Sequence, residues 1–204
     1  MATGQGEFRI VVIAASAGGV EALSHILSEL PPTFPLAIAI VQHRSLSSPH
    51  LLAKILGRKT PLHVKDAEDG EVIQAGVVYV APPGVHLVVD EDRRFALMDG
   101  DRVKYVRPSG DVLFASAAEA FGSQVIAVVL TGGDGDGSGG ILVVKQRGGV
   151  VLSQDVASAQ VSGMPRSAIA TGNVDYVLPL GEIAPALQSL ALGIVRGADP
   201  RVVA

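Results

Sequence analysis

The 204-residue sequence contains no cysteine and no tryptophan, and only 4% of its residues are aromatic. The absence of cysteine excludes disulfide bonds, thiolate zinc sites and cysteine nucleophiles. The scarcity of aromatic rings argues against a surface that stacks nucleic-acid bases. A net charge of −4 gives no bulk attraction to a phosphate backbone. We therefore expect no nucleic-acid partner.

The sequence also lacks a long apolar run, although 48% of its residues are hydrophobic and its mean hydropathy is +0.41. The stretches Ile10–Ala15, Leu36–Val41 and Val125–Leu130 span six residues each. A membrane-spanning helix needs about 20 apolar residues, so we expect no insertion into a membrane. Stretches of this length are typical of buried strands in a parallel sheet. Met1–Glu7 has no signal-peptide pattern, which predicts a cytoplasmic location.

Strand and helix patterns alternate along the chain and predict an α/β fold, a doubly wound, mostly parallel sheet flanked by helices. The length favours one domain, residues 1–204, with a core over 7–195. Residues 72–106 lack helical periodicity and contain several short extended pieces, which predicts an inserted region of antiparallel β-hairpins. Apolar spacing predicts helices after Gly19 and over Ser48–Leu56, Asp111–Phe121 (with Asp111 as N-cap), Ser138–Arg147 and Gly181–Val195.

Reactive side chains follow three of the predicted strands. Ser16 lies on a sharp strand-to-helix turn, His43 comes directly after the second apolar run, and Asp136 lies in a loop of glycine and aspartate. Because ligands bind beyond the carboxyl ends of parallel strands, we expect the three side chains at one edge of the sheet. A serine nucleophile, a histidine base and an orienting carboxylate make a serine hydrolase. Taken singly, Ser16 also suits a helix N-cap and His43 a surface histidine.

Two rival interpretations of the glycine-rich loops are weaker. Asp134, Asp136 and Ser138 match the first positions of a calcium-binding loop, but Lys145 stands where that loop needs a glutamate. Neither Ser16–Gly19 nor the later loop matches a phosphate-binding motif. The order serine, histidine, aspartate also differs from that of the α/β-hydrolases, chymotrypsin and subtilisin. We expect no metal and no cofactor.

Several motifs in order resemble the catalytic domain of the chemotaxis protein-glutamate methylesterases, CheB. They cover most of the chain, from Val11 to about Leu190. They are Ala15-Ser16-Ala17-Gly18-Gly19, Gln42-His43, Val78-Tyr79-Val80-Ala81-Pro82 followed by His86, Arg107-Pro108-Ser109, Asp111-Val112-Leu113-Phe114, Leu130-Thr131-Gly132, Asp136-Gly137, Gln154-Asp155-Val156-Ala157-Ser158 and Gly163-Met164-Pro165-Arg166.

The resemblance implies a doubly wound fold with a catalytic triad of Ser16, His43 and Asp136, the same residues that the strand-end argument selects. It implies hydrolysis of methyl esters on glutamate side chains of methyl-accepting chemotaxis receptors, with release of methanol. Deamidation of receptor glutamines also occurs in the family. Backbone N–H groups at Gly133 and at the helix start near Gly18 are then expected to bind the oxyanion.

The chain departs from the family pattern at both catalytic loops. Ala14 and Ala17 replace a glycine and a threonine around the serine, and Gly133, Asp134 and Gly135 replace a methionine, a glycine and an asparagine near Asp136. Asp134 brings a second carboxylate, which is expected to alter activity. The sequence shows no receiver domain before the first strand, so we expect either a stand-alone esterase or a catalytic domain excised from a longer protein.

Two alternatives stay open from the sequence. The altered loops are compatible with a non-catalytic module that keeps the fold and binds receptors or other partners. An esterase for small molecules would differ only in having a closed pocket. The sequence leaves the oligomeric state open.

Overall fold

The computed structural model describes residues 9–44 and 51–194, and its centre is a seven-stranded sheet with strand order β3-β4-β2-β1-β7-β8-β9. All neighbouring strands in this sheet are parallel. The strands are β1 Ile10–Ala15, β2 Ala37–Gln42, β3 His63–Asp66, β4 Val77–Val80, β7 Val125–Val129, β8 Val150–Gln154 and β9 Tyr176–Leu178. The three apolar runs of the sequence are the central strands, because these are covered on both faces.

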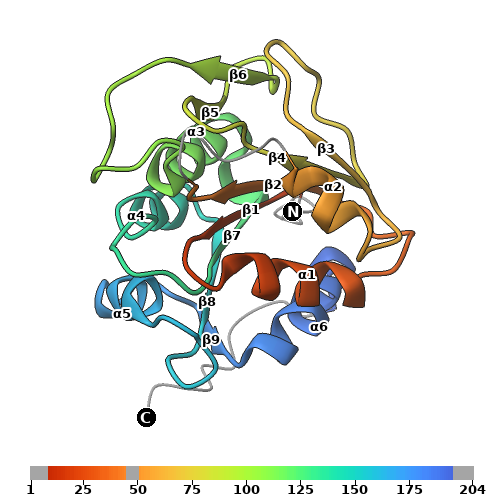
Figure 1. Cartoon of the computed structure of the whole chain (residues 1–204). Helices are drawn as coiled ribbons and strands as arrows, with labels where there is room; N and C mark the ends of the chain where they lie inside the picture. Colours follow the sequence, from red (N-terminus) through yellow and green to blue (C-terminus); the bar gives the residue numbers. More distant parts are fainter. Residues whose placement is uncertain (1–8, 45–50, 195–204) are drawn as a thin grey trace, which may run out of the picture.

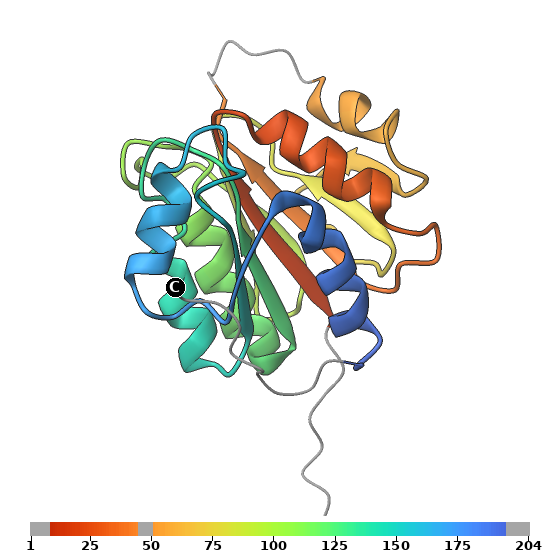
Figure 2. The same ribbon diagram turned by 90° about the horizontal axis from the view of Figure 1, so that it is seen from below.

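Helices cover both faces of the sheet, as the view from below shows (Figure 2). On one face lie α1 (Gly19–Glu29), α2 (Leu52–Gly57) and α6 (Leu180–Ala191), and on the other α3 (Gly110–Phe121), α4 (Gly140–Gln146) and α5 (Gly163–Ala170). A separate antiparallel hairpin of β5 (His86–Val89) and β6 (Phe95–Met98) packs beside α3 (Figure 1). A short 3-10 helix, η1 (Gly122–Gln124), leads into β7. The expected α/β fold class is confirmed.

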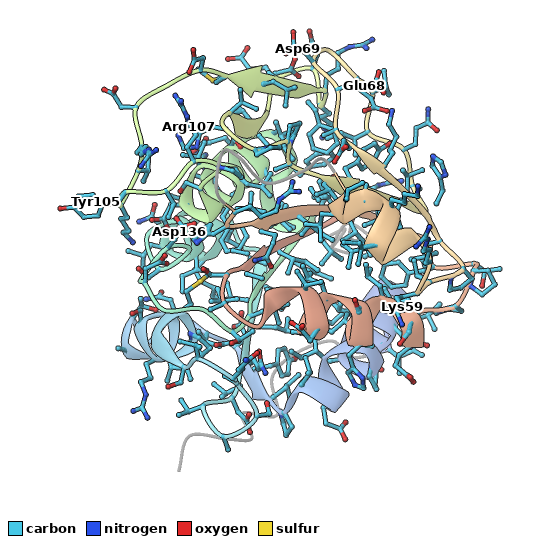
Figure 3. The ribbon with its side chains drawn as sticks, in the orientation of Figure 1. Lys59, Glu68, Asp69, Tyr105, Arg107 and Asp136 are labelled. Atoms are coloured by element: carbon cyan, nitrogen blue, oxygen red, sulfur yellow. The ribbon has the colours of Figure 1, made fainter. Side chains whose placement is uncertain are left out.

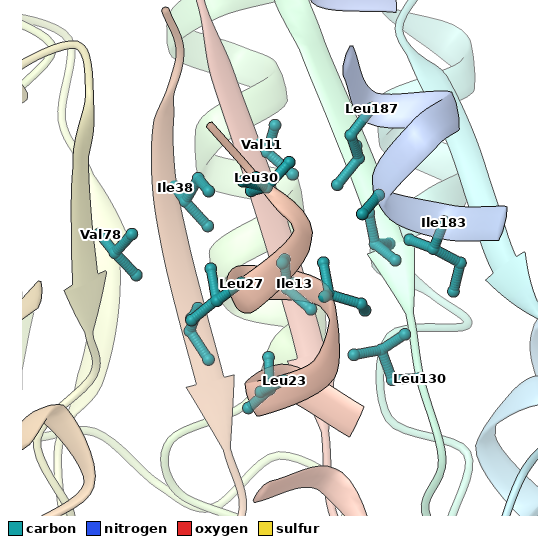
Figure 4. Packing of buried hydrophobic residues seen from close by; sticks show 14 of the residues in the cluster. Val11, Ile13, Leu23, Leu27, Leu30, Ile38, Val78, Leu130, Ile183 and Leu187 are labelled. Atoms are coloured by element: carbon teal, nitrogen blue, oxygen red, sulfur yellow. The ribbon is translucent and has the colours of Figure 1, made fainter. Parts of the chain in front are cut away.

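Alternating residues of each central strand point to opposite helix layers. Val11 and Ile13 of β1 pack under α1 and α6, where Leu23, Leu27 and Leu187 are fully buried (Figure 4). Burying one such aliphatic side chain contributes about 1.5–3 kcal/mol to folding, so this layer holds the strand ends rigidly. No helix in the described residues is long and apolar enough to cross a membrane.

The order in which strands are added to the sheet reverses at β1, and this reversal decides where a binding site can form. From β1 the chain proceeds through β2 to the edge strand β3, fills the gap between them with β4, and then crosses to β7 on the other side of β1. The connection after β1 leads to α1 on one face, whereas the loop after β7 leads to α4 on the other. Such a reversal leaves a crevice beyond the carboxyl ends of the two strands.

The structure corrects two sequence predictions. The antiparallel region predicted over 72–106 is a hairpin only at β5 and β6, because Val77–Val80 pairs in parallel with β2 and β3 inside the main sheet. Ser109, not Asp111, is the N-cap of α3. Asp111 lies in the first turn because its carboxylate accepts hydrogen bonds from the start of α4.

The sequence analysis also missed α5, because Gly163 and Pro165 interrupt the apolar periodicity there. Helix α4 starts at Gly140 and α6 ends at Ala191, so both are shorter than predicted. Residues 7, 8, 45–50 and 195 of the expected core lie outside the described residues, and with them the first part of the helix expected over Ser48–Leu56.

Candidate active site

Ser16, His43 and Asp136 lie at one edge of the sheet, after β1, β2 and β7 respectively. Strand β1 lies between the other two, so Ser16 stands between the histidine and the aspartate in strand order. The backbone N–H of His43 donates to the carbonyl of Ala15, and that of Ser16 donates to the carbonyl of Thr131, both at 2.9 Å. The three strand ends are therefore joined through their backbones.

The side chains of His43 and Asp136 meet across the end of β1. His43 Nε2 lies 2.7 Å from Asp136 Oδ2, and the aspartate is fully buried. A carboxylate accepts only, so Nε2 carries the proton and the neutral imidazole keeps its lone pair on Nδ1. The aspartate therefore orients the ring and leaves Nδ1 as the basic nitrogen.

Asp136 has a complete set of hydrogen-bond donors at the start of α3. Oδ1 accepts from Ser109 Oγ at 2.6 Å and from the backbone N–H of Asp111 at 3.1 Å. Oδ2 accepts from the backbone N–H of Gly110 in addition to His43. Burial alone would raise the pKa of Asp136, but these four hydrogen bonds outweigh it and hold the pKa of the carboxyl below its ordinary value of 3.8. The group is thus ionised at neutral pH despite its burial.

A second carboxylate faces the other nitrogen of the imidazole. Asp134 Oδ2 lies 3.3 Å from His43 Nδ1, and the Asp134 side chain is 36% exposed. The separation is within ion-pair reach, but the geometry makes no hydrogen bond and leaves the buried Nδ1 without a hydrogen-bond partner in the described residues. Asp134 Oδ1 accepts from the backbone N–H of Asp136 at 3.0 Å, which holds the loop in shape. Nδ1 is therefore free to accept a proton.

Glycine allows the loop after β7 to pass against Ser16. A β-carbon on Gly132 would lie 2.8 Å from Cβ of Ser16 and 2.1 Å from Sδ of Met164, so no larger residue fits there. Thr131 Oγ1 donates toward the carbonyls of Ala17 and Val161 at 2.9 and 3.1 Å, which ties the two catalytic loops together. Ser16 Oγ itself makes no hydrogen bond to another described residue.

The expected oxyanion positions, Gly18 and Gly133, lie in the two loops that meet at Ser16. Gly18 is the N-cap of α1 and has φ +78, and a β-carbon there would collide with Gln160. Gly133 follows Gly132 on the exposed side of the loop. The backbone N–H groups of Gly18 and Gly133 donate no hydrogen bond to any described residue. Both are therefore available as donors to a ligand.

Sequence reasoning missed the side chains that support the site from behind. Ser109 binds Asp136, and its own N–H donates to Nδ1 of the buried His86 at 3.2 Å. Lys104 Nζ lies 2.8 Å from Asp111 Oδ2 and donates to the carbonyl of Gly135 at 2.8 Å. A serine just before the apolar period of α3 was a usable N-cap signal. No local signal pointed to Lys104.

No group of three or more histidine, aspartate or glutamate side chains in the described part of the chain is arranged to hold a metal ion.

A family model described as CheB methylesterase matches residues 11–187. The chain belongs to this family. A protein of Leptospira interrogans is 43% identical to it over 177 residues, which cover 87% of this chain and 92% of that protein. Protein-glutamate methylesterase/protein-glutamine glutaminase 1 of Saccharophagus degradans is 41% identical over 180 residues, which cover 88% of this chain and 49% of that protein.

The family also explains the fold. The crystal structure of the CheB methylesterase catalytic domain of Thermotoga maritima superposes with a TM-score of 0.87 at 40% sequence identity, covering 91% of this chain and all of that domain. The doubly wound sheet and its site-bearing edge are thus shared with the CheB methylesterase family.

Proposed function

We propose that the protein is a serine hydrolase that removes methyl esters from glutamate side chains of methyl-accepting chemotaxis receptors in the cytoplasm. Membership of the CheB methylesterase family and the name of the Saccharophagus relative support the reaction. The observation that carries it is the ionised, buried Asp136 on His43 Nε2, with Nδ1 of the same ring lacking a hydrogen-bond partner in the described residues, and with Ser16 on the neighbouring strand end.

In the proposed reaction, His43 Nδ1 takes the proton of Ser16 Oγ as that oxygen attacks the ester carbonyl. Asp136 stabilises the imidazolium that forms and stays ionised, because its four donors favour the charged carboxylate. Ser16 Oγ must turn toward Nδ1 when substrate binds, as is common for catalytic hydrogen bonds that tighten only in the complex.

The tetrahedral intermediate then carries its charge on the former carbonyl oxygen. The free N–H groups of Gly133 and Gly18, in the two loops that meet at the serine, support an oxyanion site there. The imidazolium returns its proton to the methoxide, methanol leaves, and water resolves the acyl-enzyme by the same steps. With a glutamine side chain the leaving group would be ammonia, so the site also suits deamidation.

The decisive experiment incubates the protein with methylated receptor and measures methanol and ammonia separately. We expect methanol release by the wild-type protein and none above background by Ser16→Ala. A fluorophosphonate should label Ser16 in the wild-type protein and leave Ser16→Ala unlabelled. Methanol release by Ser16→Ala near the wild-type rate would show that another group performs the reaction.

A further inference from the structure

One exposed aromatic side chain has no role in the fold. Tyr105 lies in the loop between β6 and α3, and 92% of it is exposed, more than any other large hydrophobic residue of the described chain. Its hydroxyl makes no hydrogen bond, and its ring makes no aromatic or cation–π contact, with any other described residue. Of the two other tyrosines, Tyr79 is fully buried and Tyr176 is partly buried. An isolated ring in water stabilises nothing in this chain.

The backbone under Tyr105 is unfavourable for a bulky residue. Val103 and Val106 exchange backbone hydrogen bonds of 3.1 and 3.0 Å, which closes a two-residue turn. Lys104 and Tyr105 at its centre have φ values of 47 and 69. Positive φ at both central positions characterises the turns that favour Asn-Gly. A tyrosine in this place is strained, and strain of this kind is concentrated at functional sites.

Lys104 explains how the turn is held and where it lies. Its ammonium group contacts Asp111 Oδ2, the Gly135 carbonyl and Ser138 Oγ, each at 2.8 Å, so all three of its donors are used. Gly135 and Ser138 flank Asp136 in the loop after β7. The turn is therefore fastened to the catalytic loop, and Tyr105 projects outward on the same side of the molecule as Asp136 (Figure 3).

We propose that Tyr105 is a contact residue for the protein substrate, and this inference rests on the proposed function. While a methylated glutamate reaches Ser16, the receptor segment that carries it lies over the adjacent rim, where the tyrosine ring packs against its apolar side-chain surface. Tyrosine suits this contact because it offers a large, rigid apolar face at low entropic cost and is enriched among residues that dominate binding. The tether through Lys104 keeps the ring in place before substrate arrives.

The test compares two substrates on three variants. With methylated receptor, Tyr105→Gly should lower kcat/KM about tenfold, mainly through KM. With p-nitrophenyl acetate, which is too small to reach the turn, its activity should stay within about twofold of wild type. Its melting temperature should equal or exceed that of wild type, since glycine adopts positive φ without strain. Tyr105→Phe should keep receptor activity within about twofold.

Leu192→Ala is the matched control, because Leu192 is 67% exposed at the end of α6, which covers the face of the sheet opposite α3. It should leave both substrates unaffected. Receptor kcat/KM of Tyr105→Gly within twofold of wild type would overturn the inference, and so would an equal loss with p-nitrophenyl acetate or an equal loss in Tyr105→Phe. A wild-type protein that releases no methanol from the receptor would instead refute the proposed function, and the inference with it.

Discussion

The floor of the site, made by Asp136 and Ser109, and its rim, made by Asp134, Lys104 and Tyr105, differ in how they are held. The floor is fully buried, and both Asp136 oxygens accept two hydrogen bonds. The rim is exposed and depends on single loops and one lysine tether. A buried carboxylate needs all its partners, because an unpaired charge in the interior is costly.

This difference suggests a division of labour between the two regions. The floor sets the position and ionisation of the group that orients His43, and a change there affects every substrate. The rim is expected to contact the parts of a substrate that extend beyond the catalytic residues. A change there should therefore affect the receptor more than p-nitrophenyl acetate. The predictions below test this division in order of expected effect.

The largest effect is expected at the centre of the floor. In Asp136→Asn, one carboxylate oxygen is replaced by an NH2 group, which can only donate. In either orientation of the side chain, this NH2 group faces two hydrogen-bond donors and cannot accept from them. We expect kcat to fall by about 10⁴, as for other triad aspartates. Methanol release from methylated receptor measures it, with circular dichroism as the check of folding. A folded variant that keeps a tenth of wild-type activity would contradict the role of Asp136.

A smaller loss of kcat is expected for a change at Ser109, which bonds Asp136 from behind. Ser109→Ala removes one hydrogen bond to a charged group, which corresponds to about 1.5–3 kcal/mol, or roughly tenfold to hundredfold in kcat. The loss should be the same for receptor and for p-nitrophenyl acetate. Ser116→Ala, on the same helix but bonded to Leu113 and Val89, is the control and should keep full activity. A loss of kcat on the receptor alone would show that Ser109 functions as a rim residue and not as a floor residue.

The rim carboxylate should matter least. Asp134→Asn keeps an oxygen for the N–H of Asp136 and loses only a partly exposed charge near His43. Because exposed ion pairs contribute about 0.2–1 kcal/mol, kcat should change by less than about fivefold. Steady-state kinetics on both substrates measure this. A loss of kcat as large as that of Asp136→Asn would show that Asp134 has the role assigned to Asp136.

Asp136 should also affect how stability depends on pH. The folded-state pKa of Asp136 is lowered, so its ionised form stabilises the fold above its unfolded value, and this contribution disappears as pH falls through the folded value. The free energy of unfolding should therefore decline less steeply below pH 3.8 in Asp136→Asn than in wild type. Denaturant titrations across this range decide the point, and parallel curves for the two proteins would contradict it.

Much of the fold followed from local patterns. Apolar runs too short for a membrane predicted the central strands, and their ends predicted the positions of Ser16, His43 and Asp136 at one edge. The error at Val77–Val80 has a physical cause: a short extended segment looks the same whether its partner is parallel or antiparallel. Helix α5 was missed because glycine and proline hid its period.

The sequence by itself determined which residue types stand at the strand ends and which family the motifs resemble, because apolar periodicity and motif order are local properties. Only the tertiary structure decided that Asp136 takes Nε2 of His43 and leaves Nδ1 free, that the start of α3 supplies its donors, and that Lys104 fastens a strained turn beside the site. These contacts join segments 25 or more residues apart. They exist only once the strand order brings separate loops to one edge.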